Sequence, residues 1–185
     1  MFSALVLSTV VIFVAELGDK SQLMAMTFAT RYRARDVILG ITAATAIVHL
    51  ASVGIGYFIG ASFERYQGPI AIAAGIAFLG FAAWTLRGDE LTDEEAQKAR
   101  KAKGSALLAV GLAFFLAELG DKTMLATITL AVREDWFGTW IGSTVGMVAA
   151  DALAIGVGAL LGRKLPEKVI QYGAAAAFAI FGLVL

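Results

Sequence analysis

Two short motifs carry the residues of this chain that could perform chemistry. The first reads Glu16-Leu17-Gly18-Asp19-Lys20-Ser21, and the second reads Glu118-Leu119-Gly120-Asp121-Lys122-Thr123. Each motif lies inside a long apolar run, where charge is expensive. A charged side chain at the centre of a membrane helix costs about 2.5–3.5 kcal/mol on insertion scales. The carboxylates must therefore be compensated by partner residues, by protons or by a bound cation.

The composition is that of a membrane protein. Of the 185 residues, 59% are hydrophobic and 16% are charged, and the mean hydropathy is +0.79. A soluble domain is usually about 45–50% apolar. The formal net charge is zero, which gives no reason to expect nucleic acid as a partner. The absence of cysteine excludes disulfides, thiolate metal sites and a cysteine nucleophile.

The second half of the chain repeats the first at a constant offset of 102 residues. Glu16 maps to Glu118 and Asp19 maps to Asp121, and several glycines follow the same offset without a gap. Such self-similarity indicates an internal duplication. We therefore divide the chain into a first repeat at 1–86, a linker at 87–104 and a second repeat at 105–185.

Six apolar runs predict the fold, which is an all-α membrane protein with six transmembrane helices. Each run is about long enough to cross a hydrocarbon core of roughly 30 Å. The first lacks a basic start and continues through its motif, so we do not expect a cleaved signal peptide. Three spans per repeat is an odd number, which predicts an inverted repeat. The runs cover about 2–29, 37–61, 69–86, 106–132, 136–161 and 166–185.

Lysine and arginine placement predicts the orientation in the membrane, because basic residues accumulate on the cytoplasmic side. The turn at 31–36, the linker and the turn at 163–168 share one side, whereas the other side holds only Arg65 and Arg133. We therefore expect a multi-pass protein of the inner (plasma) membrane with a cytoplasmic linker and both termini outside. The basic residues on the linker side are Arg31, Arg33, Arg35, Arg87, Lys98, Arg100, Lys101, Lys103, Arg163, Lys164 and Lys168.

Helical spacing predicts a cation site between the two motifs. On a continuous helix, Glu16 and Asp19 lie three positions apart and share a face. Glu118 and Asp121 do the same in the second copy. Four carboxylates, with hydroxyl and carbonyl oxygens nearby, suit a hard divalent cation such as Ca²⁺, Mn²⁺ or Mg²⁺.

The motif glycines allow two interpretations. Gly18 and Gly120 could let the helix unwind and offer carbonyl oxygens, or they could permit close helix packing. We favour close packing.

The remaining motif residues also allow two roles each. Lys20 and Lys122 could replace the cation when the site is empty, but we favour simple charge balance, with Lys20 four positions after Glu16. Ser21 and Thr123 point away from the acidic stripe of an ideal helix. We therefore expect them to bond backbone carbonyls, and a ligand role would require a distorted helix.

The second helix of each repeat adds one ionisable group at the equivalent position. In the first half this group is His49, the one histidine of the chain, and in the second half it is Asp151. A lone buried histidine is usually structural, but the matching aspartate favours function. We expect the pair to relay protons or to help select the metal.

Other function classes fit less well. A membrane-embedded enzyme would need a motif such as H-E-x-x-H, which this sequence lacks, so we do not expect an enzyme. A cation channel also uses acidic rings. Inverted repeats with paired charges inside the spans favour alternating access instead.

The paired motifs resemble the E-x-G-D-[KR]-[ST] signatures of the GDT family of membrane cation/proton exchangers. The resemblance covers essentially the whole chain. It implies that Glu16, Asp19, Glu118 and Asp121 bind the cation and exchange it for protons. The short form resembles the bacterial members, which implies Mn²⁺ export, with Ca²⁺/H⁺ exchange as the alternative. It implies no permanently bound cofactor, and the oligomeric state stays open.

Overall fold

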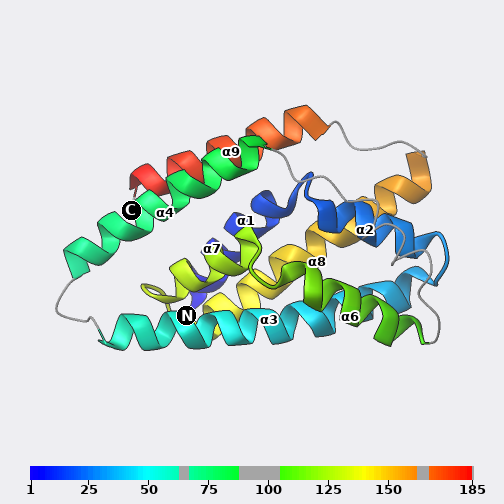
Figure 1. Cartoon of the computed structure of the whole chain (residues 1–185), viewed down its shortest axis with the longest axis horizontal. Coiled ribbons are helices and arrows are strands. Elements are labelled where there is room, and N and C mark those ends of the chain that lie inside the picture. The colour runs from blue at the N-terminus through cyan, green and yellow to red at the C-terminus, as the bar shows by residue number, and fades with distance from the viewer. Residues whose placement is uncertain (63–66, 88–104, 162–166, 185) are drawn as a thin grey trace.

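The computed structural model describes residues 1–62, 67–87, 105–161 and 167–184 (Figure 1). Within these ranges the secondary structure is entirely helical, which confirms the all-α prediction. Most of the predicted linker, residues 88–104, lies outside the described part of the chain, as does most of the basic turn at 163–168. The helices are α1 (Phe2–Glu16), α2 (Lys20–Ala29), α3 (Ala34–Ser62), α4 (Gln67–Arg87), α6 (Ala106–Glu118), α7 (Lys122–Ala131), α8 (Trp136–Leu161) and α9 (Glu167–Val184).

Several helices have the length and composition to cross a membrane. Three of those described qualify, namely α3, α4 and α8, and the bent pair α1–α2 would add a fourth. Helix α6 and the apolar part of α9 are shorter. The chain is therefore a multi-pass membrane protein by these criteria, whereas the six spans and their inverted orientation stay predictions.

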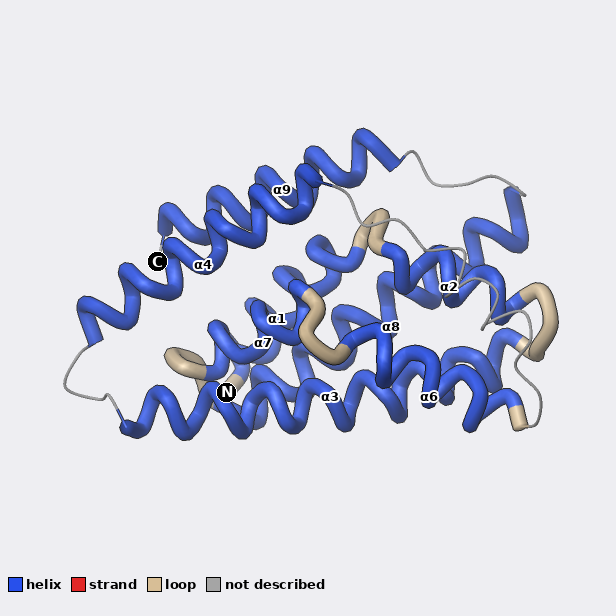
Figure 2. Tube along the Cα trace, in the orientation of Figure 1, coloured by secondary structure: helices blue, strands red, loops and turns tan. Residues whose placement is uncertain are grey.

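Both motifs break their helices, which answers the question that the sequence left open at Gly18 and Gly120. Helix α1 ends at Glu16, and α2 begins at Lys20 at an angle of 78° to it. Gly18 has φ 76° and Gly120 has φ 81°, a left-handed conformation that glycine adopts at little cost. The glycines therefore unwind the helix, and our preference for close packing at these positions is wrong. The two breaks are the tan segments near the middle of Figure 2.

The packing of the helices follows the internal repeat. Helix α1 packs against α8 of the other half, and its counterpart α6 packs against α3. Gly40 of α3 lies so close to α6, and Gly142 of α8 so close to α1, that a Cβ at either position would clash. The equivalent residues Thr45 and Met147 contact each other, with Oγ1 to Sδ at 3.3 Å. Each motif is therefore held against the long helix of the other repeat.

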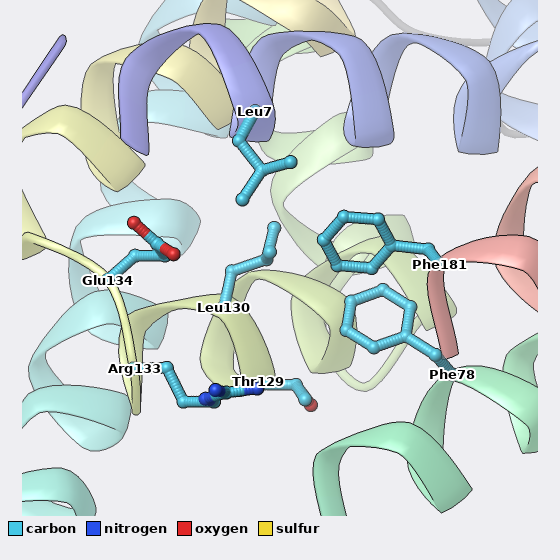
Figure 3. A pocket seen from close by; sticks show the side chains of 7 residues that line it. All are labelled: Leu7, Phe78, Thr129, Leu130, Arg133, Glu134 and Phe181. Atoms are coloured by element: carbon cyan, nitrogen blue, oxygen red, sulfur yellow. The ribbon is translucent and has the colours of Figure 1, made fainter. Parts of the chain in front are cut away.

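Helices α4 and α9 pack together along one side of the bundle (Figure 1). Their contact contains a cluster of aromatic rings, of which Phe78 and Phe181 have centroids 4.9 Å apart. A pocket of about 10 Å³ lies between these two rings, Leu7 of α1 and Leu130 of α7, as Figure 3 shows. This volume is close to the minimum that holds one water molecule. No motif residue lines the pocket, so it is separate from the predicted cation site.

Candidate ion site

The helix breaks place four buried carboxylates at helix ends. Glu16 is the last residue of α1 and Glu118 is the last residue of α6, whereas Asp19 and Asp121 are the N-caps of α2 and α7. The Asp19 side chain accepts a hydrogen bond from the Ser21 backbone N–H at 3.4 Å. At most 5% of each of the four acidic residues is exposed. The shared helical face that we predicted is absent, because the two acids of each motif belong to different helices.

The motif hydroxyls turn toward the acids. Ser21 donates a hydrogen bond to Glu16, and Thr123 donates one to Glu118 at 2.9 Å. Thr123 Oγ1 also lies 3.5 Å from Asp121 Oδ2. The expectation that Ser21 and Thr123 point away from the acids is wrong, because it assumed a straight helix. The break turns each hydroxyl back onto the glutamate at the end of the preceding helix.

A lysine connects the two motifs. The Lys122 ammonium of the second motif forms a hydrogen-bonded ion pair with Asp19 of the first. Both side chains are almost fully buried, with exposures of 3% and 0%. The intrahelical i,i+4 geometry that we expected for Glu16 and Lys20 is absent, since the break separates them into two helices. Charge balance is therefore achieved across the repeats for at least one of the two lysines.

Several carboxylate oxygens have no hydrogen-bond partner. The buried oxygens without a partner are Glu16 Oε2, Glu118 Oε1 and both carboxylate oxygens of Asp151. Electrostatic repulsion acts between Glu16 and Glu118, and both are also repelled by Asp151. Among the described residues, no three His, Asp or Glu side chains are close enough together to hold one metal ion. The acids therefore form a loose cluster with free acceptor oxygens instead of a closed coordination shell.

The two residues that we predicted as a functional pair, His49 and Asp151, have different surroundings in the structure. Both side chains are fully buried, in α3 and α8 respectively. Asp151 lies beside Ser21 and is repelled by Asp19, so it belongs to the acidic cluster. Neither ring nitrogen of His49 has a hydrogen-bond partner. The predicted role of His49 in proton relay or metal selection stays a prediction.

A comparison with known protein families finds a family whose model matches both repeats, including the two motifs. Residues 4–93 and 106–185 match the family model described as "Divalent cation/proton antiporter GDT1". This chain belongs to the GDT1 family. Membership makes it a membrane transporter and not an enzyme, with divalent cations and protons as the transported species. No solved structure matches the chain.

Relatives of this GDT1 protein include bacterial and plant proteins. A protein of Vibrio cholerae serotype O1, named as a proposed manganese exporter, is 32% identical over 99% of this chain and 90% of its own length. A GDT1-like protein of Synechocystis is 28% identical, with 100% of this chain and 97% of that protein covered. The chloroplastic GDT1-like protein 2 of rice is 33% identical over 93% of this chain, which spans 57% of the rice protein.

Sequence reasoning missed one residue that holds the first break of this GDT1 protein in place. The Gln22 side chain accepts a hydrogen bond from the Gly18 N–H and donates one to the Ala150 carbonyl of α8, both at 2.8 Å. At the equivalent position, Met124 Sδ lies 3.2 Å from the Gly120 nitrogen and accepts its hydrogen bond. The available signal was a lone amide inside an apolar run, four residues after the motif glycine.

Proposed function

We propose that this chain exports a divalent cation, Mn²⁺ before Ca²⁺, from the cytoplasm in exchange for protons. In this proposal the cation binds to Glu16, Asp19, Glu118 and Asp121. The antiporter family supports the reaction class, and the name of the Vibrio relative supports manganese as the cargo. The observation that carries the site is the convergence of buried acids from both repeats, in which Glu16 and Glu118 each keep one acceptor oxygen that no hydrogen bond satisfies.

The chemistry of the donor set fits a hard divalent cation. Carboxylate and hydroxyl oxygens are ligands of Mn²⁺, Mg²⁺ and Ca²⁺. Buried polar atoms normally have a hydrogen-bond partner, so each exception needs an explanation. A bound cation provides one, because it would satisfy the free oxygens and reduce the repulsion among the acids.

Exchange for protons follows from the use of one set of acids for both ions. Carboxylates must lose their protons to ligate a metal, so metal binding and protonation exclude each other. A protein that carries either metal or protons across the membrane, but not both at once, is an antiporter. In this proposal the Lys122 ammonium, which pairs with Asp19 in the structure, competes with the cation for that carboxylate.

The arrangement of the chain ends supports the proposed orientation. Both ends lie in the left half of Figure 1, whereas the turn between α2 and α3 lies at the right. That turn carries Arg31 and Arg33, so the basic residues described there lie away from both termini. We propose that this basic end faces the cytoplasm together with the linker at 87–104, and that both termini lie outside the inner membrane.

The test is cation transport by the purified protein in proteoliposomes, with Mn²⁺ and Ca²⁺ compared with and without a pH gradient. We expect Mn²⁺ flux that an opposing proton gradient drives, and that Asp19→Asn abolishes. Asp135→Asn is the matched control, because Asp135 is an exposed aspartate immediately before α8. A preference for Ca²⁺ would assign the alternative cargo. Flux that ignores the pH gradient would contradict exchange and indicate a channel.

A further inference from the structure

We propose that Asp151 is a fifth carboxylate that contacts the transported cation. This inference rests on the proposed function and extends its ligand set to a helix outside both motifs. Asp151 lies within α8, which carries neither motif, and its side chain lies beside Ser21 of the first motif. It therefore reaches the acidic cluster by tertiary packing.

The burial of Asp151 is the first argument. Its exposure is 0%, and both of its oxygens lack a hydrogen-bond partner. Each motif glutamate has a hydroxyl donor for one of its oxygens, so Asp151 is the less satisfied carboxylate. A buried polar group without a hydrogen-bond partner carries a desolvation cost, which is larger when the group is charged. The protein retains this cost at a position where a cation would remove it.

The surroundings of Asp151 are the second argument. It is repelled by Asp19, and it acts in the same way on Glu16 and Glu118. These acids come from both motifs, so Asp151 lies where the two motifs approach each other. The neighbouring Ala150 carbonyl accepts the hydrogen bond from Gln22, which fixes this part of α8 against the first break.

A ligand on α8 has a consequence for transport. Helix α8 packs against both α1 and α2, which meet at the first break. A cation held by Asp151 of α8 and by the acids of the first break would connect α8 to α1 and α2. Its binding and release would therefore change the contact between α8 and these two helices. The equivalent position in the first repeat holds His49, so the two repeats would contribute chemically different groups.

The experiment measures Mn²⁺ and Ca²⁺ affinity of the purified full-length protein by titration, together with its thermal unfolding without metal. Asp151→Asn keeps the shape and removes the charge. We expect Mn²⁺ affinity to fall at least about tenfold, because losing even a residue that only supports a metal ligand costs that much. Asp135→Asn is the control and should bind as the wild type does. Unfolding without metal should be unchanged or shifted to higher temperature, since repulsion is removed.

A second variant separates contact from a distant charge effect and decides the question if Asp151→Asn does not fold. Asp151→Glu keeps the charge and moves the carboxylate by one methylene. A contacting ligand should change the ratio of Mn²⁺ to Ca²⁺ affinity, whereas a distant charge should leave it unchanged. Wild-type affinity in Asp151→Asn, or a wild-type ratio in Asp151→Glu, would overturn the inference. If Asp19→Asn binds Mn²⁺ like the wild type, the proposed function itself fails.

Discussion

Replacing Lys122 by methionine tests whether its ammonium occupies the place of the cation. Lys122→Met keeps the length of the side chain and leaves Asp19 without its positive partner. Both groups are almost fully buried, so water screens the ion pair little. Removing one partner of a buried pair costs about 3–5 kcal/mol. We therefore expect the metal-free variant to unfold more easily than the wild type.

The same variant should bind Mn²⁺ more tightly. A divalent cation restores the missing charge, and a recovery of about 3 kcal/mol corresponds to roughly 100-fold in affinity, at tenfold per 1.4 kcal/mol. The gain should shrink as the pH falls, because protons also neutralise Asp19. The assay is thermal unfolding of purified protein across a Mn²⁺ titration at several pH values, with exposed Lys168→Met as the control. Wild-type stability together with wild-type affinity in Lys122→Met would refute the reasoning.

Four further outcomes are expected. Asp121→Asn should abolish Mn²⁺ transport in proteoliposomes without unfolding the protein, whereas Asp19→Asn should abolish it and also lower the stability, because it removes one partner of the buried ion pair with Lys122; normal flux in either variant would contradict the site. Mn²⁺ affinity should weaken as the pH falls from about 8 to 5.5, because protons compete for the acids; a constant affinity would rule out competition. His49→Ala should shift this pH profile more than it lowers maximal binding, whereas an equal loss at every pH would make His49 a ligand. A cysteine at Ala96 should react only with cytoplasmic reagents and one at Gln67 only with external reagents, and labelling of both from one face would disprove the topology.

Much of the candidate site could be predicted from the sequence because charge inside an apolar run is costly and therefore conspicuous. The burial of Glu16, Asp19, Glu118 and Asp121 follows from that argument. The constant offset also anticipated that Asp151 would accompany His49 as a second buried ionisable group. These inferences needed only residue types and spacing, and they did not depend on the shape of the backbone.

The conformation of the motifs could not be predicted in the same way. Arguments from residue spacing assume a continuous helix. Glycine is frequent in membrane helices, so the presence of Gly18 alone does not predict a break. The Lys122–Asp19 ion pair was equally inaccessible, because it joins residues from different repeats. Such a pair depends on how α2 and α7 are placed by α8 and α3, which hold them from opposite halves.

The breaks account for the chemistry that a straight helix could not provide. Irregular backbone at membrane depth is tolerated only where protein or a water-filled cavity surrounds it. Here Gln22 accepts the freed Gly18 N–H, and Met124 accepts that of Gly120. A thioether is a weaker acceptor than an amide oxygen, so the second break is held less firmly by this contact than the first. Both repeats therefore break the motif helix at a glycine with positive φ. They differ in how strongly a side chain holds that glycine. They also differ in the ionisable group on the long helix, which is His49 in α3 and Asp151 in α8.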